Sequence, residues 1–205
     1  MTNCETGGSK KDEIIDVASA LFSLKGYKAT TIENISNRVS LHKTSLFHYF
    51  KNKEEILMAV MDKSLNEHLN ILSDIANDPN VSGEVKLKLA LERQISTACK
   101  YRDHINVYLS EITSLSPKNR KRYREKRKEH ESFFEKIVKE IQADGRSRLF
   151  KGLDPKIVKL GILGMCNWII KWYDDNGPST PTEIYSTFHS IITGSPIDSA
   201  HKGDT

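Results

Sequence analysis

The sequence has few cysteines and no long apolar run, and both absences narrow the class of protein. Its 3 cysteines stand far apart among 205 residues without CxxC spacing, which argues against a structural zinc site and favours a reducing cytoplasm. The longest apolar stretch, Ile157–Ile170, is interrupted by Lys159 and Asn167, so we expect no membrane partner. The polar N-terminus lacks the apolar core of a signal peptide. These absences predict a soluble, cytoplasmic protein.

Catalytic and metal-binding signatures are also missing. The sequence has no P-loop, no HExxH and no GxSxG motif, and no cysteine–histidine arrangement in a recognisable context. Four scattered histidines lack the spacing of metal ligands and are expected at the surface, namely His68, His130, His189 and His201. We therefore expect no catalytic residues, no metal and no cofactor, and a helical enzyme is kept only as an alternative.

What the sequence does contain is helical periodicity from end to end. Apolar residues recur at three- and four-residue spacing, no alternating strand pattern survives, and caps and proline signatures separate the segments. This predicts an all-α fold of about nine helices. We expect a helix-turn-helix domain over residues 10–55, a ligand-binding and dimerisation bundle over 56–194, and flexible termini at 1–9 and 195–205.

The stretch from Thr30 to Lys53 predicts a helix-turn-helix. Thr30 is a candidate N-cap, and Glu33 three residues later would complete a capping box. After a break at Ser40–Leu41, a short second run has Leu46 and Phe50 on one face. Its other face carries donors and aromatic rings that suit phosphates and base edges, namely Lys43, Ser45, His48 and Tyr49. We interpret Lys43–Tyr49 as a recognition helix.

This stretch resembles the N-terminal domain of the TetR family of transcriptional regulators. The resemblance covers about residues 10–63 and rests on residue types and spacing together: Phe22, Gly26, Tyr27, Thr30, Thr31, Ile32 and Ile35, then Val39 to Phe50, then Lys53, Glu54 and Ile56. Three positions depart from the family pattern, with Ser40 at the turn glycine, His42 at the usual serine and Phe47 at the usual tyrosine. Ser40 must either accept a strained turn or change the turn.

The resemblance implies operator double-stranded DNA as a partner. It places Lys43, Thr44, Ser45 and His48 near the base edges, and Thr31, Tyr49 and Lys53 at the phosphates, with Thr30 and His42 in the same set. The alternative is that His48 or Tyr49 packs against the first helix. One helix-turn-helix reads half a site, so a homodimer is expected, with its two reading heads about 34 Å apart or a multiple of that turn.

A second informative stretch is the helix Ile157–Tyr173. Gly161 and Gly164 lie on one face and allow close approach of another helix, either from the partner subunit or from within the chain. The resemblance favours the partner subunit, with residues of the last helix joining the interface: Ile184, Phe188 and Ile191.

The same helix supplies the candidate ligand site. Trp168 and Trp172 share a face and are expected in the core or at a ligand, and a buried Asn167 needs a hydrogen-bond partner. The pattern resembles the acyl-CoA-responsive branch of the TetR family, which implies a repressor released by a small hydrophobic ligand such as a fatty acyl-CoA. Further pocket candidates are Arg102, His104 and Tyr108.

Two questions about the ligand stay open at this point. The basic run 118–128 is either a solvated helix face or a contact for the phosphates of coenzyme A. The alternative to an acyl-CoA sensor is a multidrug-type sensor with an aromatic pocket, which would need buried carboxylates. The candidates for those carboxylates are Glu92, Asp103 and Glu111.

Overall fold

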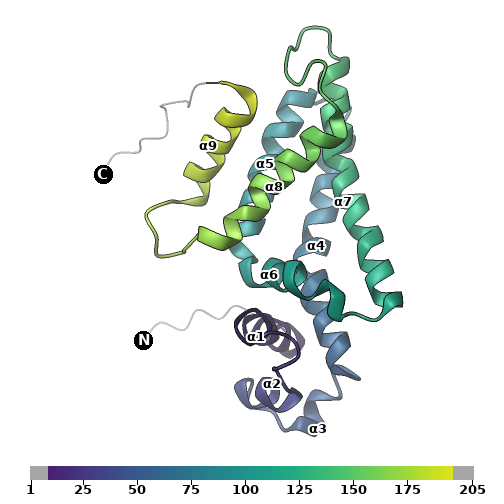
Figure 1. The fold of residues 1–205 in the computed structure, drawn as a ribbon, viewed down its shortest axis with the longest axis vertical. Coiled ribbons are helices and arrows are strands. Elements are labelled where there is room, and N and C mark those ends of the chain that lie inside the picture. Colours follow the sequence, from purple (N-terminus) through teal and green to yellow (C-terminus); the bar gives the residue numbers. More distant parts are fainter. Residues whose placement is uncertain (1–8, 196–205) are drawn as a thin grey trace. The chain divides into compact units, whose positions relative to one another are not determined.

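The computed structural model describes residues 9–195, apart from the side chain of Glu67. Over these residues the chain forms helices and no strand, which confirms the predicted all-α fold (Figure 1). The elements are α1 Lys10–Lys25, α2 Ile32–Arg38, α3 Lys43–Leu46, α4 Lys53–Asn77, α5 Gly83–Lys100, α6 Arg102–Glu111, the 3-10 turn η1 Ile112–Ser114, α7 Pro117–Ala143, α8 Pro155–Trp172 and α9 Pro181–Thr193. The termini expected to be flexible lie mostly outside the described residues.

The chain divides into two compact units. The first contains the residues up to Ser64 together with Asp103–Arg124, and the second contains Leu65–Arg102 together with the residues from Glu125 onward. Both long helices, α4 and α7, therefore contribute to both units. Most of α6 and the beginning of α7 belong to the first unit, and the domain boundary expected at residue 55 stays a prediction.

In the first unit, α1, α2 and α3 pack around apolar side chains that are fully or almost fully buried. These are Ile14, Phe22, Ile35, Leu46 and Phe50. The ring of Phe22 meets the ring of Tyr27 edge to face, with 5.3 Å between centroids. The three short helices are thus held by one shared core and not by their own propensity.

In the second unit, α5 packs against α8 and α9 (Figure 1). Gly83 begins α5 where a Cβ atom would lie 2.8 Å from Cγ1 of Ile141 on α7, so a larger residue there would push the helices apart. Two lysines with almost no exposure are neutralised across helix contacts. Lys86 meets Glu140 at 2.8 Å, and Lys159 meets Glu135 at 2.9 Å. Among the described helices, none is long and apolar enough to cross a membrane.

One predicted cap is wrong. The N-cap of α2 is Thr31, whose side chain and that of Asn34 form a reciprocal capping box. Thr30 is fully buried instead, and its hydroxyl donates to the backbone carbonyls of Leu21 (3.2 Å) and Gly26 (2.9 Å). Both threonines have cap chemistry, and sequence alone did not show which one would be drawn into the core.

The turn between α2 and α3 is strained at one residue. Ser40 has a φ of 53°, in the left-handed region that favours glycine. We expect Ser40→Gly to raise the free energy of unfolding by about 0.5–1 kcal/mol, measured by urea denaturation. Ser110→Gly within α6 is the control and should lower it by about 1 kcal/mol, because helical φ angles favour serine over glycine. A loss of stability in Ser40→Gly would contradict the strain.

Candidate functional site

The outer surface of α3 presents polar side chains together. Lys43, Thr44, His48 and Tyr49 are exposed and Ser45 is half-buried, whereas Leu46 on the inner face is fully buried. Neither His48 nor Tyr49 is packed away against α1. The helix ends earlier than predicted, at Leu46, and turn hydrogen bonds continue to Phe50. The segment therefore offers the rings of His48 and Tyr49, the ammonium group of Lys43 and the hydroxyls of Thr44 and Ser45.

The turn that presents α3 is fixed by backbone contacts. Ser40 takes the strained conformation, and the N–H of Leu41 donates to the carbonyl of Ser36 at 2.9 Å. Lys10 Nζ on α1 donates to the carbonyl of Val39 at 2.8 Å, where α2 ends. His42 stands at the N-cap of α3 without a side-chain cap bond and is exposed. The orientation of α3 thus depends on the turn and the core, and not on its own cap.

Two of the residues proposed for DNA have internal contacts. Thr30 is wrong as a DNA-contacting side chain, because it is fully buried. Lys53 Nζ donates to the carbonyls of Tyr27 (2.9 Å) and Thr30 (2.8 Å) and lies 4.3 Å from the centroid of the Tyr27 ring. Burial lowers the pKa of Lys53, and the charge of Glu111 acts against that shift. A phosphate contact by Lys53 stays a prediction.

Two carboxylates brace the first unit, and sequence analysis missed both. Glu111 Oε1 accepts from the N–H of Tyr27 at 3.0 Å, although the two residues are 84 positions apart. Glu54 accepts from the N–H of Ser116 at 2.7 Å and from the amide of Asn119 at 2.8 Å, and these bonds lower its pKa. No periodicity within the sequence relates such distant partners. Because Glu111 already accepts these bonds, it is a poor counter-ion for a cationic drug.

His104 lies on α6 against α1 and not in a ligand pocket of the second unit. Its Nε2 is 3.3 Å from Asp16 Oδ1, and Lys63 Nζ is 2.6 Å from the same oxygen. Burial lowers the pKa of His104 to about 4, although the charges of Asp16 and Asp103 act to raise it. His104 is therefore neutral near neutrality.

This depressed pKa predicts acid sensitivity of the first unit. In the unfolded chain His104 takes up a proton near its ordinary pKa of 6.5, and in the folded chain only near a pKa of about 4. The free energy of unfolding is therefore highest above the ordinary pKa and decreases as the pH is lowered through the range between the two values. Between about pH 7 and about pH 5 we expect the free energy of unfolding to fall by roughly 1–2 kcal/mol from this residue. His104→Gln should remove that part of the fall in urea denaturation at both pH values. An unchanged pH dependence in the variant would contradict the assignment.

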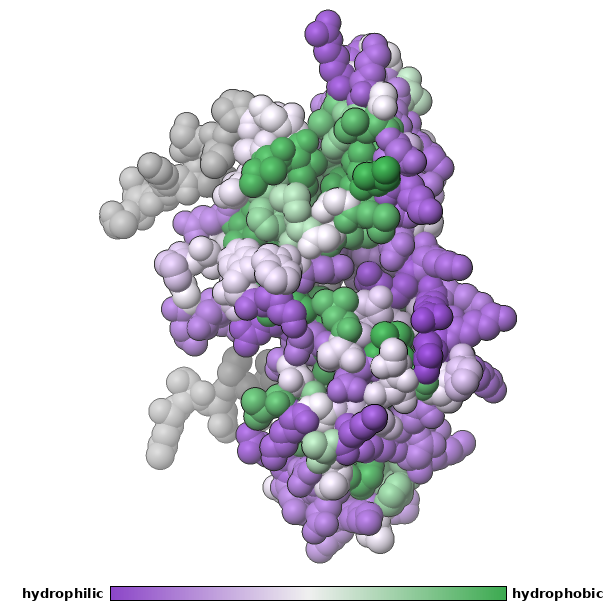
Figure 2. Space-filling model, in the orientation of Figure 1, coloured by the Kyte–Doolittle hydropathy of each residue, from purple (hydrophilic) through white to green (hydrophobic). Residues whose placement is uncertain are grey.

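One face of α8 is apolar and exposed. Ile157, Gly161, Gly164, Trp168 and Trp172 follow one another at helical spacing, and we call these residues the α8 stripe. Ile157 is 68% exposed, Trp168 65% and Trp172 45%, and a Cβ atom at either glycine would meet nothing within 4 Å. Figure 2 shows apolar side chains gathered over α8. Of the two alternatives for the tryptophans, the core is excluded, because Cys166, Ile169 and Ile170 occupy the buried face, and a ligand contact stays a prediction.

The last helix contributes less to this surface than predicted. Ile191 on α9 is 63% exposed, and Phe188 is half-buried. Ile184 is buried within its own chain, where α9 packs on α5, so its assignment to a dimer interface is wrong. Its inward position follows from the capping box of Thr180 and Glu183, which fixes where α9 begins.

The proposed ligand residues belong to both units. Arg102 donates through Nη1 to the carbonyl of Tyr173, which ends α8. Tyr108 pairs with Tyr123 in the first unit, with ring centroids 5.1 Å apart. Asn167 is half-buried beside the exposed tryptophans of the α8 stripe.

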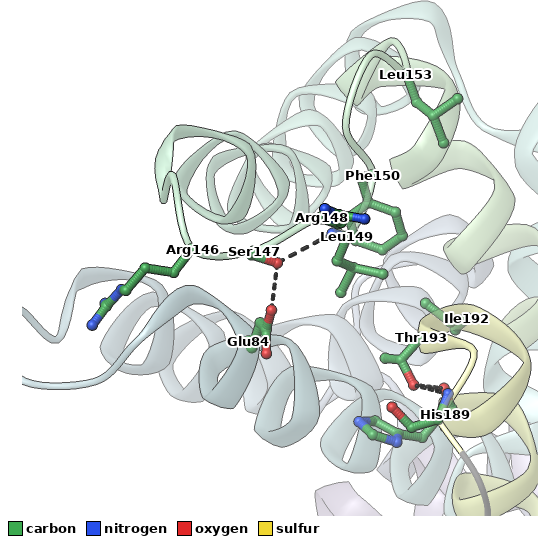
Figure 3. A pocket seen from close by; sticks show the side chains of 11 residues that line it. Glu84, Arg146, Ser147, Arg148, Leu149, Phe150, Leu153, His189, Ile192 and Thr193 are labelled. Carbon is green, nitrogen blue, oxygen red and sulfur yellow. Dashed lines mark hydrogen bonds between the residues drawn. The ribbon is translucent and has the colours of Figure 1, made fainter.

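A cavity of about 540 Å3 lies at one end of the second unit (Figure 3). It is bounded by Glu84 of α5, by the loop between α7 and α8, and by the last turn of α9. Its polar groups largely satisfy one another: Ser147 donates to Glu84, and Thr193 Oγ1 donates to the carbonyl of His189 at 2.8 Å. No residue proposed as a ligand contact lines it.

The expectation of surface histidines is wrong for two of them. His68 on α4 and His130 on α7 are each 2% exposed, and their rings lie 5.2 Å apart. The signal was present in the sequence, since Leu65 and Leu72 flank His68 and Phe134 follows His130 at helical spacing. His189 is half-buried, and His201 lies outside the described residues.

Much of the basic run on α7 is paired with its own chain. Arg120 donates to the carbonyls of Thr113 and Leu115, and Arg122 meets Asp62 at 3.4 Å. Lys118, Lys121, Arg124 and Lys128 are exposed. Among the described residues, no three histidine, cysteine, aspartate or glutamate side chains form a group that could hold a metal ion.

Comparison with known proteins identifies the family. Residues 14–60 match the family of bacterial regulatory proteins called tetR, and residues 80–195 match the tetracyclin repressor-like C-terminal domain. The chain belongs to the TetR family. Its homologues are transcriptional regulators and not enzymes.

Individual TetR-family relatives are similar over almost the whole chain. The transcriptional repressor KstR2 of Mycolicibacterium smegmatis is 28% identical over 91% of this chain and 90% of its own length. The structure of PfmR from Thermus thermophilus has a TM-score of 0.79 and 26% identity, covering 88% of this chain and 97% of that one. AibR in complex with isovaleryl coenzyme A and operator DNA has a TM-score of 0.77 at 22% identity, covering 90% and 98%, and so shares the fold.

Proposed function

We propose that this TetR-family protein is a homodimeric repressor that binds operator DNA through α2 and α3 and leaves it when an acyl-CoA enters the second unit. The observation that carries the DNA-binding half is the surface of α3. Its apolar residues are buried, and Lys43, Thr44, His48 and Tyr49 are turned to solvent on a segment too short to be stable alone. Repression is supported by the similarity of nearly the whole chain to the transcriptional repressor KstR2.

The homodimer is supported by the α8 stripe. An exposed apolar surface that includes two tryptophans is costly in water and is characteristic of an interaction site. Gly161 and Gly164 leave the helix surface flat between the larger side chains, so a partner helix can approach closely. Ile191 of α9 is exposed as well. A twofold pairing of these surfaces would give two α3 segments for two half-sites.

The acyl-CoA is supported by the fold neighbour AibR, whose structure contains isovaleryl coenzyme A. A ligand shifts the protein off DNA only by the difference in its affinity for the two states. Titrating acyl-CoAs of increasing chain length against the operator-bound protein tests this effector. We expect release by an acyl-CoA and none by coenzyme A alone. Release by an unrelated apolar drug, with every acyl-CoA inactive, would reject the effector but not the DNA binding.

Base reading by α3 is tested with duplexes from the promoter next to the protein's own gene. Ser45→Ala or His48→Ala should change the preference between operator variants by roughly 1–3 kcal/mol at one base pair. Lys43→Ala tests whether that cation reads a base or holds a phosphate, since loss of a phosphate contact weakens all sequences alike and lowers the salt slope by about one. Equal losses on every duplex from all three variants, measured by fluorescence anisotropy, would show that these side chains do not read bases.

A further inference from the structure

A polar cluster is buried between three helices of the second unit. The rings of His68 of α4 and His130 of α7 lie 5.2 Å apart with their planes tilted by 41°, and α5 provides Gln94 and Thr97, each less than a tenth exposed. His68 Nδ1 is 2.8 Å from Thr97 Oγ1, and His130 Nε2 is 3.0 Å from Gln94 Oε1. Most buried residues on neighbouring turns of these helices are apolar, namely Leu72, Leu91, Ile95, Phe134 and Ile137, although Ser64, one turn before His68, is polar. The cluster is therefore a polar island in an apolar interior.

The contact with Gln94 determines which nitrogen of His130 carries the proton. Gln94 Oε1 is a carbonyl oxygen that only accepts, so His130 Nε2 must be the donor. Burial, followed by the charges of Arg127 and His68, holds the pKa of His130 well below its ordinary value, so the ring is neutral. In the neutral ring Nδ1 then carries a lone pair and no hydrogen, and it can only accept a hydrogen bond.

That acceptor has no donor among the residues that the structure describes. His130 Nδ1 is inaccessible to solvent and makes no hydrogen bond. The two buried lysines of this unit are satisfied, since Lys86 meets Glu140 and Lys159 meets Glu135. A buried polar atom without a partner destabilises the fold. The hydrogen bond to Gln94 accounts for Nε2 of this imidazole, but folding leaves Nδ1 without a donor.

The cavity beside the α7–α8 loop is the alternative site for an effector, but its polar groups select less strongly for a hydrogen-bonding ligand. Its side chains are partly exposed, and the hydroxyls of Ser147 and Thr193 already donate within the protein (Figure 3). A ligand there would replace water on satisfied groups. A ligand at His130 would satisfy a group that the protein leaves unsatisfied, which gives it both affinity and selectivity.

We propose that His130 Nδ1 accepts a hydrogen bond from a hydroxyl group on the acyl part of the effector, so that the protein responds to a hydroxyacyl-CoA in preference to the saturated or keto chain. The inference rests on the proposed function, because it assumes that an acyl-CoA enters the second unit. A saturated chain leaves Nδ1 without a donor. A keto oxygen is itself an acceptor and would face the Nδ1 lone pair, whereas a hydroxyl donates to it.

The experiment compares operator release by three forms of one chain: decanoyl-CoA, the same chain with a hydroxyl, and the same chain with a keto group. The hydroxyl or keto group is placed either near the thioester end of the acyl chain or at its far end, because the cluster does not show how far along the chain the group would meet Nδ1. For the full-length protein we expect the hydroxyl form, in one of these positions, to release DNA at a concentration at least about tenfold lower than the other two. Equal potency of all three forms would overturn the inference.

Two variants test the assignment to His130. His130→Phe should abolish the preference for the hydroxyl form while decanoyl-CoA still releases DNA. Gln94→Leu removes the acceptor that holds the proton on Nε2, so Nδ1 can carry it, and the keto form should approach the potency of the hydroxyl form. His189→Phe is the matched control, a half-buried histidine of the same unit outside the cluster, and should keep the wild-type preference. Thermal unfolding checks that each variant is folded.

The outcomes separate this inference from the function on which it rests. Release by all three chains with no preference, or a hydroxyl preference that survives in His130→Phe, overturns the role of His130 and leaves the acyl-CoA repressor intact. Absence of release by any acyl-CoA, from the wild type and from every variant, rejects the acyl-CoA effector and the inference together. The wild-type series gives a decisive result even if His130→Phe does not fold.

Discussion

Gly161→Arg is expected to leave the protein monomeric and to reduce its affinity for a two-half-site operator by on the order of a hundredfold or more. In the isolated chain the new side chain meets no obstacle, since a Cβ at Gly161 would have nothing within 4 Å. Arginine also favours helix over glycine, so the fold of the subunit should be at least as stable. In a dimer built on the α8 stripe, the same substitution would place a charge and a long side chain between two closely packed helices.

The measurement is the molar mass by light scattering, together with anisotropy on duplexes that carry one or two half-sites. Gly145→Arg is the matched control, because it adds the same residue at another glycine with open space, in the loop after α7 and away from the α8 stripe. It should remain dimeric. Weakened binding to two half-sites with nearly unchanged binding to one is the expected signature of lost pairing. A dimeric Gly161→Arg protein would move the interface away from α8.

The local chemistry of this chain was largely predictable from its sequence. Proline after Asp154 and after Thr180 marked the starts of α8 and α9, and both caps are present. The faces of the α3 segment followed from spacing, since Leu46 and Phe50 are buried. These features depend on neighbours within four positions, and that is the range over which helical periodicity carries information.

Features that depend on distant partners were not predictable in the same way. For the α8 stripe, the residues alone left open whether the glycines meet the partner subunit or a helix of the same chain, and whether the tryptophans lie in the core or at a ligand. Nothing local distinguishes an apolar face that is buried within its own chain from one that meets another subunit. His68 and His130 were assigned to the surface because each was judged by its residue type and not by its apolar neighbours. The exchange of roles between Thr30 and Thr31 is of the same kind, since the choice depends on packing against α1.

Lys53→Met is expected to destabilise the first unit by about 2 kcal/mol, which is less than the full value of two charge-assisted hydrogen bonds because the side chain is only half-buried. Methionine keeps the apolar length of the side chain and removes the ammonium group that donates to the carbonyls of Tyr27 and Thr30. Those carbonyls lie just before Thr31, the cap of α2, so their release should loosen the position of α2 and α3. Urea denaturation measures the loss directly.

Operator binding then distinguishes a brace from a phosphate clamp. A side chain that only holds a phosphate would leave the free energy of unfolding unchanged and lower the salt slope of binding by about one. A brace lowers stability, and it weakens operator binding through the misplaced α3 with little change in the salt slope. Lys51→Met is the matched control, since Lys51 is exposed and two residues away. If Lys53→Met and Lys51→Met unfold at the same urea concentration, the two internal hydrogen bonds of Lys53 contribute nothing to the fold, and its ammonium group is free to bind DNA.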